Sequence, residues 1–328
     1  MATEIIEPNG KAGSAYRPPG SARTVPARVN LALTIGIVVV NAVLVMGLPL
    51  LGLDILAWLA LSLLIVLAAP LHWGLIHEGI HRLLLPGRRR NDAAARVLAV
   101  AFGAPFAILK FGHLFHHRHN RTALDRTEHA HATDFAGRMR ARVVFYFRLF
   151  GGLYLGEVVL GLLLLAPAGV LRSAVRRTTG TAPDGLEPLA AQIDRDLLDP
   201  ATIRSARVDA LAVLAIGAAA VWAWGPDVWL VALTFFARGA VVSVLDNAFH
   251  YSGPLDELHA ADNARLPRLL ALGVLNSNYH GIHHRYPRIS WRHLPAVHAA
   301  TVGETRFDGA YLALIGRQLR GPVFVSPP

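Results

Sequence analysis

The sequence predicts an all-α polytopic membrane protein, with four transmembrane helices in two hairpins and a cytoplasmic helical cap that holds two metal ions. Three observations lead to this fold class. Of the 328 residues, 53% are hydrophobic and only 16% are charged. Several apolar runs reach the roughly 20 residues that a helix needs to cross a bilayer. Histidines cluster close to these runs, and such clusters suit metal ions better than they suit packing.

The first hairpin follows a polar segment. Residues 1–28 contain scattered Pro, Gly and Ser, which predicts a disordered cytoplasmic tail. The apolar run Val29–Leu51 is too long for a signal-peptide core and predicts an uncleaved first span. Gly52-Leu53-Asp54 predicts a tight turn, and Ile55–Ile76 then returns as the second span. Arginines flank both ends of this hairpin whereas the turn carries only Asp54, so the positive-inside rule places both ends in the cytoplasm.

The segment after the first hairpin is expected to lie at the cytoplasmic surface. The helix of the second span should continue past the membrane and carry His77 and His81. The apolar segment Arg96–Lys110 is short and contains Pro105, which predicts an interfacial helix. The charged stretch Leu124–Arg142 is expected to be cytoplasmic.

The second hairpin is formed by Arg207–Trp224 and Val228–Leu245, joined by the turn Gly225-Pro226-Asp227. A further apolar stretch, Val143–Leu171, is interrupted by charges, glycines and a proline. If the histidine clusters on either side of these stretches meet on one side, the chain between them crosses an even number of times. We therefore expect Val143–Leu171 to be a re-entrant or interfacial pair of helices, and Arg172–Ala206 to be a cytoplasmic linker.

The expected organisation is a tail over residues 1–28, a membrane domain over residues 29–300 and a C-terminal tail over residues 301–328. Both termini are expected in the cytoplasm, and the membrane is expected to be a bacterial inner membrane.

Composition excludes several kinds of site. Cysteine is absent, which excludes thiolate zinc sites, iron–sulfur clusters and disulfides. The net charge of +10 comes almost entirely from arginines beside apolar spans, so it indicates membrane topology and not nucleic-acid binding. Neither a GxGxxG sequence nor a P-loop is present, so no nucleotide or flavin site is indicated.

Eight of the sixteen histidines form three clusters, which we call boxes. Residues at i, i+3 and i+4 lie on one face of a helix, because each residue advances about 100°. Eight imidazoles are too many for one metal ion and suit two. The first box contains His77 and His81, the second His113, His116 and His117, and the third His280, His283 and His284.

Zinc is the main alternative. His77-Glu78-Gly79-Ile80-His81 matches H-E-x-x-H, in which two histidines bind Zn²⁺ and the glutamate is the general base of a metalloprotease. An intramembrane protease would place this motif at a helix end. One zinc ion, however, would leave the second and third boxes without a function.

The order HxxxH, HxxHH, HxxHH, each after an apolar segment, resembles the membrane fatty acid desaturase and hydroxylase superfamily. The third box continues from Asn278-Tyr279 through Tyr286-Pro287 to Trp291 and Leu294-Pro295, which is similar to the usual ending of that family. The resemblance covers roughly residues 50–300. It implies that the eight box histidines are ligands of two iron ions, that is, of a diiron centre.

The resemblance also implies a ninth ligand after the last span. Some desaturases have a histidine there, with an asparagine one turn earlier that acts through water. His250 is similar to that histidine, but Asn247 lies three residues before it and Asp246 occupies the i−4 position. Glu78, His119, Asp246 and Asn247 are therefore candidates for orienting ligands from outside the metal's own donor set.

The activity implied by the resemblance is O₂-dependent desaturation of a fatty acyl chain, with a hydroxylase or carotenoid ketolase as the alternative. Removing hydrogen from an unactivated methylene needs a metal-based oxidant. The substrate would be a lipid or an acyl chain on a carrier. The two electrons would come from a separate ferredoxin, rubredoxin or cytochrome with its reductase, attracted by the basic cytoplasmic face.

Several other polar residues have structural explanations. Arg238 lies within the fourth predicted span, where it is costly unless it faces the bundle interior. His72 is expected to be buried and satisfied by a neighbour. The histidines expected to face solvent or headgroups are His129, His131, His259, His293 and His298.

Overall fold

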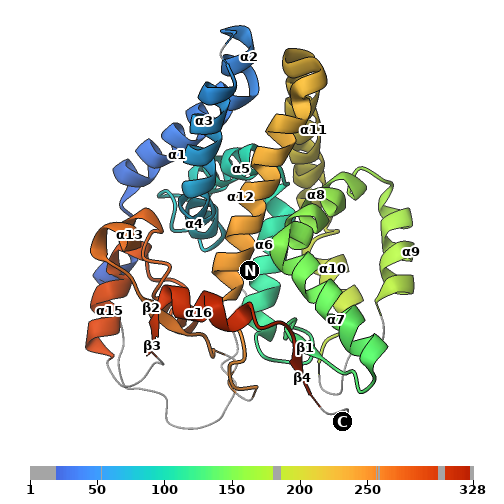
Figure 1. Cartoon of the computed structure of the whole chain (residues 1–328), viewed down its shortest axis with the longest axis vertical. Coiled ribbons are helices and arrows are strands. Elements are labelled where there is room, and N and C mark those ends of the chain that lie inside the picture. The colour runs from blue at the N-terminus through green and yellow to red at the C-terminus, as the bar shows by residue number, and fades with distance from the viewer. Residues whose placement is uncertain are drawn as a thin grey trace.

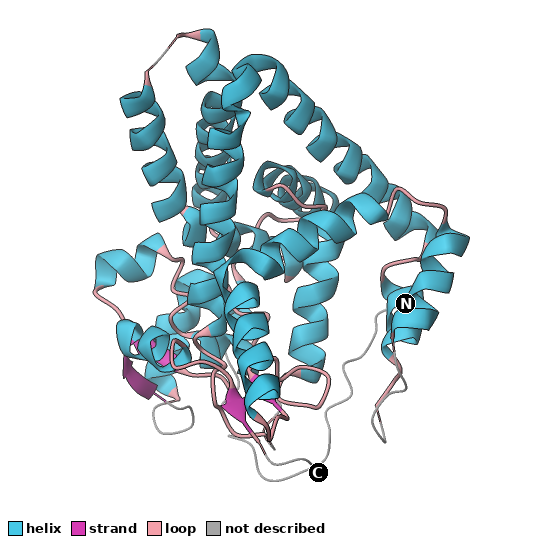
Figure 2. Cartoon of the chain, turned by 45° about the vertical axis from the view of Figure 1, so that its right-hand side comes forward, coloured by secondary structure: helices cyan, strands magenta, loops and turns pink. Residues whose placement is uncertain are grey.

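The computed structural model describes residues 20–52, 54–179, 186–255, 257, 259–301 and 307–325. The chain is mostly helical, which confirms the prediction of an α-helical protein (Figures 1 and 2). The expected disorder of residues 1–19 falls outside the described residues. Residues 20–23 form the short 3₁₀ helix η1 (Gly20–Arg23), so the expected tail is shorter than 28 residues.

The first hairpin comprises helices that rise to the top of Figure 1 and return. They are α1 (Ala27–Ala42), the π-helical turn η2 (Val43–Gly47), α2 (Leu48–Leu50), α3 (Ile55–Leu67) and α4 (Ala69–Ile80). The Asp54 carboxylate caps α3 by accepting from the backbone N–H groups of Leu56 and Ala57. Helix α4 continues α3 after a 45° bend and carries the first box, as expected.

A single helix over residues 96–110 is not what the structure shows. The segment is divided between α5 (Arg88–Phe102) and α6 (Phe106–His119), which are bent by 100°. Gly103 adopts φ 92°, a left-handed conformation that ends α5, and Pro105 begins the next helix. The break turns α6 back so that the second box faces α4.

The stretch between the hairpins is a bent pair of helices followed by two further helices. They are α7 (Phe135–Phe147), the π-helical turn η3 (Arg148–Gly152), α8 (Leu153–Leu163), α9 (Ala168–Thr178) and α10 (Leu189–Asp196). Non-helical angles at Phe150 and Gly151, which has φ 121°, separate α7 from α8. The segment Arg172–Ala206, expected to be a cytoplasmic linker, contains the helix α10.

The second hairpin comprises α11 (Pro200–Trp224), the 3₁₀ turn η4 (Gly225–Val228) and α12 (Trp229–Asn247). Arg238 of α12 is fully buried, as expected for an interior arginine. Its guanidinium donates to Asn41 Oδ1 at 2.7 Å and to the carbonyls of Ala101 and Phe102 at 3.2 and 2.7 Å. It therefore satisfies the carbonyls at the end of α5, where the helix stops.

The C-terminal part folds around the third box. Its helices are α13 (Arg268–Gly273), α14 (His280–Arg285), η5 (Trp291–His293), α15 (Leu294–Ala300) and α16 (Tyr311–Gln318). Residues assigned to a C-terminal tail thus include α16, where Tyr311 and Leu314 are buried against Ala248 and Phe249.

Two small parallel sheets accompany these helices. β1 (His129–Ala130) pairs with β4 (Val323–Phe324), and His129 lies opposite Val323. β2 (Asn263–Arg265) pairs with β3 (Phe307–Ala310), and Asn263 lies opposite Phe307. Both pairs are short additions to a helical fold.

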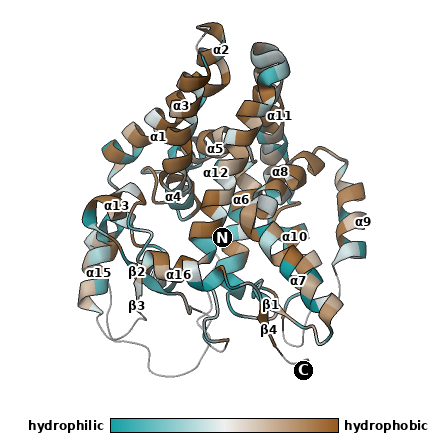
Figure 3. Ribbon diagram, in the orientation of Figure 1, coloured by the Kyte–Doolittle hydropathy of each residue, from teal (hydrophilic) through white to brown (hydrophobic). Residues whose placement is uncertain are grey.

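The apolar helices indicate a membrane protein. Hydrophobic residues predominate in α1, α3 and α11, in the upper half of Figure 3. Among described residues, three segments are long and apolar enough to cross a bilayer: 20–50, 135–163 and 200–247. The last of these contains both helices of the second hairpin. Two bent pairs, α3–α4 and α5–α6, could raise the number to five.

Candidate metal centre

Nine histidines converge below the membrane hairpins in two groups. The donor nitrogens within each group lie within 4.8 Å of one another. Both groups combine helices far apart in sequence, and His250 joins the eight box residues. Group one contains His77, His81, His113, His117 and His283, and group two contains His116, His250, His280 and His284.

The second and third boxes each supply both groups. His113 and His117, at i and i+4, belong to group one, whereas His116 belongs to group two. His280 and His284 likewise belong to group two, and His283 to group one. Neighbouring residues on a helix point about 100° apart, so adjacent histidines reach different centres.

The spacing of the ring nitrogens fits metal coordination. Nitrogens at about 2.0–2.1 Å from one ion lie roughly 2.8–3.4 Å apart in octahedral or tetrahedral geometry. In group one the Nε2 atoms of His81 and His113 are 2.9 Å apart, and those of His117 and His283 are 3.0 Å apart. In group two, four Nε2 pairs are separated by 2.9 to 3.3 Å. The two groups thus suit two metal ions.

The protonation state of the imidazoles also fits metal binding. Burial, reinforced by neighbouring imidazoles, holds the pKa values of His280, His283 and His284 well below the ordinary 6.5. These rings are therefore neutral at pH 7, which is the form that binds metal. His77 Nε2 is buried without a hydrogen-bond partner in the described part of the chain. A metal ion would satisfy this nitrogen.

Close packing positions the first box. A Cβ at Gly79 would lie 2.5 Å from the Ala95 side chain, so this glycine lets α4 lie directly against α5. On the same turn, the Glu78 carboxylate accepts from the Trp291 backbone N–H at 3.4 Å. The Trp291 indole donates to Asn30 Oδ1 at 3.0 Å. These contacts join α1, α4 and η5, so the first box is tied to the loop after the third.

The third box is held by the strand region beside it. Gly281 faces the Ala261 carbonyl so closely that no Cβ would fit. Asn263 Oδ1 accepts from the Ile282 N–H at 3.1 Å, and Asn278 Nδ2 donates to the Ala264 carbonyl at 2.9 Å. The short helix α14 is thereby fixed from outside, since six residues have little helical stability of their own.

Arg121 positions His250. Its guanidinium donates to the carbonyls of His250, Gly253 and Pro254 at 3.0, 2.7 and 3.2 Å. Its charge is balanced by Glu128 at 2.6 Å. The turn after α12 therefore has a defined shape. Arg121 adopts φ 65°, a conformation that is uncommon for arginine, so local sequence patterns do not predict this contact.

Asp125 is a site residue that sequence reasoning missed. Its carboxylate lies 2.5 Å from His116 Nδ1, while His116 Nε2 faces group two. A carboxylate behind a ligand nitrogen fixes the ring and raises its basicity. The only available signal was an acidic residue in the polar stretch after the second box.

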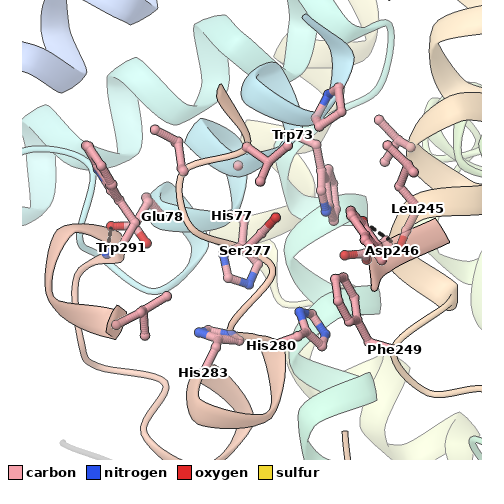
Figure 4. Close-up of a pocket in the computed structure, with 17 residues that line it drawn as sticks. Trp73, His77, Glu78, Leu245, Asp246, Phe249, Ser277, His280, His283 and Trp291 are labelled. Atoms are coloured by element: carbon pink, nitrogen blue, oxygen red, sulfur yellow. Dashed lines mark hydrogen bonds between the residues drawn. The ribbon is translucent and has the colours of Figure 1, made fainter. Parts of the chain in front are cut away.

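The four residues expected to orient ligands have the following contacts in the described part of the chain. The Glu78 carboxylate faces the Trp291 backbone and accepts its N–H at 3.4 Å (Figure 4). His119 Nε2 faces Gln192 Oε1 at 2.9 Å, away from both groups. Asn247 Nδ2 donates to the Ser243 carbonyl at 2.8 Å. Asp246 faces the cavity beside His280, where it interacts with Trp73.

The remaining histidines mostly follow expectation. His72 is buried, and its Nε2 lies 2.9 Å from the Leu98 carbonyl. His131 and His259 are exposed, while His293 and His298 are half-buried. The expectation for His129 was wrong: its side chain is 7% exposed because it packs beside Glu128.

An apolar cavity opens beside the two groups. It contains about 590 Å³ of empty space, part of which is open to solvent, and lies between α4, the end of α12 and the third box. Trp73, Leu245 and Phe249 line it, and His77, His280 and His283 face it (Figure 4). His77 and His283 belong to group one and His280 to group two. A ligand in this cavity would therefore lie against both centres.

A comparison of the sequence with curated proteins gives no significant match. The family model described as fatty acid desaturase matches residues 55–313, which include all three boxes and His250. This match covers most of the chain and confirms the resemblance. The chain belongs to the fatty acid desaturase family.

Proposed function

We propose that this protein catalyses O₂-dependent desaturation of a fatty acyl chain at two iron ions. One observation supports the proposal above the others: an apolar cavity has histidines of both metal groups on its wall. An alkyl chain fits such a lining, and it would lie beside both ions.

The balance of the reaction defines what the protein must provide. A –CH₂–CH₂– segment and O₂, with two electrons and two protons, give –CH=CH– and two molecules of water. The two iron ions, when bound and reduced, would supply the oxidant for this step. Trp73, Leu245 and Phe249 would hold the chain and exclude water. Asp125 would keep the His116 ring in its ligating orientation.

A hydroxylase or carotenoid ketolase of the same family is the alternative. It would use the same histidines and differ in adding oxygen to the substrate carbon. The apolar cavity suits either substrate class, so the product distinguishes these activities.

The zinc protease alternative has less support. The Glu78 carboxylate accepts from the Trp291 backbone, whereas a general base must face the metal-bound water. We expect Glu78→Gln to retain bound metal and measurable desaturase activity, because glutamine can still accept this hydrogen bond. Proteolysis without O₂ that disappears in Glu78→Gln would establish the protease instead.

We further propose that both termini and the metal centre face the cytoplasm of a bacterial cell, with four crossings by the two hairpins. The kink at Phe150 and Gly151 supports a re-entrant path for the segment over residues 135–163. The chain naturally lacks cysteine, so single cysteines placed at Glu187 and Asp227 report topology directly. Labelling at residue 187 from outside intact cells would contradict the four-crossing arrangement.

The proposed partners follow from the reaction. The substrate is a lipid or an acyl chain on a carrier within reach of the bilayer. The chain contains no nucleotide motif, so a ferredoxin, rubredoxin or cytochrome with its reductase would deliver the electrons. Arginines at the cytoplasmic ends of the helices would favour an acidic donor.

Expression in a host, followed by mass spectrometry of its lipids, tests the function. Desaturation gives acyl chains two mass units lighter, and hydroxylation gives chains sixteen units heavier. Purified protein should contain about two irons per chain. His116→Ala and His283→Ala should each lower iron content and abolish the product, whereas exposed His131→Ala should do neither. Full product formation by either box variant would refute the proposal.

A further inference from the structure

A second cavity lies on the opposite side of the turn after α12. It contains about 420 Å³ of empty space, part of which is open to solvent, and no described residue lines both cavities. Leu245, Asp246 and Phe249 face the first cavity, while Asn247 and His250 face the second. The second cavity therefore borders group two without being the cavity proposed for the reaction.

This cavity contains an arginine whose charge is not neutralised. Arg148 is half-buried on its wall, and within the described part of the chain its guanidinium has no hydrogen bond or ion pair. The two acidic groups that act on it are already engaged: Asp125 with His116, and Glu128 with Arg121. A half-buried guanidinium without a partner favours binding of an anion.

The backbone places Arg148 at this position. It begins the π-helical turn η3, and the Ser243 hydroxyl donates to its carbonyl at 3.4 Å. The kink at Phe150 and Gly151 follows directly. Phe147 and Phe150 are exposed, at 61% and 46%. The corner thus presents apolar rings outward and a cation inward, and π-helical turns of this kind are frequent at functional sites.

The other residues that line the cavity indicate the chemistry of the rest of the ligand. Phe145, Leu149 and Leu153 form an apolar wall beside Arg148, while Thr127 and Gln318 are among the polar residues that line the rest. A free inorganic anion would leave the apolar wall unused. An amphiphile with an anionic head would use both, and it could reach the cavity from the bilayer along the exposed rings of α7 and η3.

We propose that this cavity is a second binding site, for an amphiphile whose carboxylate or phosphate group is held by Arg148. Its alkyl part lies against Phe145, Leu149 and Leu153. The site is separate from the proposed reaction cavity, and its occupancy does not depend on turnover.

Cysteine protection tests this site directly, because the natural chain has no thiol. In Leu153→Cys, carrying its metal ions in detergent, we expect decanoate to slow modification by a neutral methanethiosulfonate at least tenfold. Decanol at the same concentration should give little protection. In Leu153→Cys with Arg148→Met, the decanoate concentration for half-protection should rise roughly tenfold to a hundredfold, the usual worth of charge-assisted hydrogen bonds.

Two controls make the result specific. Arg140→Met removes an exposed arginine of α7, the helix that leads into η3, and should leave protection unchanged. Arg148→Lys should keep protection within a few-fold, and helical content and bound metal verify that each variant is folded. The same protection assay with Thr127→Cys, on the polar side of the cavity, should give the same result. Undiminished protection in folded Arg148→Met, or equal protection by decanol, would overturn the proposal. If acetate or inorganic phosphate protected the cysteine as effectively as decanoate, the ligand would be a small anion and the proposal of an amphiphile would be refuted.

Discussion

Asn30→Ala should uncouple the first box from the third. Asn30 is fully buried on α1. Its Nδ2 donates to the carbonyls of Leu84 and Leu83 at 2.9 and 3.3 Å, and its Oδ1 accepts from the Trp291 indole at 3.0 Å. Three net hydrogen bonds are worth about 3 kcal/mol. A stranded indole N–H adds about 1–3 kcal/mol, so we expect a loss of about 4–6 kcal/mol in the free energy of unfolding.

The measurement is the free energy of unfolding in detergent, followed by near-ultraviolet circular dichroism, together with the rate at which a chelator removes bound metal. Group one joins His77 and His81 to His283, so a loosened contact between α1, α4 and η5 should speed metal release. Gly36→Ala is the matched control, because a Cβ on this residue of α1 meets no neighbouring atom within 4 Å. A loss below about 1 kcal/mol in Asn30→Ala, with unchanged metal release, would refute this account.

Two further variants test how single residues support the metal groups. Asp125→Asn removes the carboxylate behind His116 Nδ1 and should weaken metal affinity about 10–100-fold, measured by competition with a chelator. Unchanged affinity would show that Asp125 does not orient the ring. Gly281→Ala should displace α14 from the Ala261 carbonyl and cost about 1–3 kcal/mol in unfolding free energy with partial loss of metal. Gly217→Ala, which meets no neighbouring atom, should be neutral or slightly stabilising.

Local patterns were sufficient to predict the helices and the positions of the boxes. Apolar length predicted the helices of both expected hairpins, and Asp54 and Gly225 lie at helix ends where turns were expected. The break between α5 and α6 was also readable in principle, because Gly103 and Pro105 are strong helix breakers. Because this break was not predicted, a single interfacial helix was expected where the structure has two helices that meet at a sharp angle.

Long-range contacts could not be read from the sequence. Asp125 reaches His116 only because the chain reverses at Arg121, whose positive φ is unusual for arginine. Glu78 was expected to orient an imidazole. In the structure it accepts a hydrogen bond from the Trp291 backbone, because the loop that contains Trp291 packs onto α4. Such contacts depend on how separate segments dock, which local periodicity does not encode.

The sharing of boxes between the two groups has a consequence for how the protein acquires its metals. His116 and His117 are consecutive, as are His283 and His284, yet each pair is divided between the groups. An ion bound by group one would fix α6 against α14, and the same two helices carry three of the four nitrogens of group two. The first ion therefore prepares the site for the second. Metal uptake by the apoprotein should be sigmoidal, with fully loaded and empty molecules outnumbering those that hold a single ion.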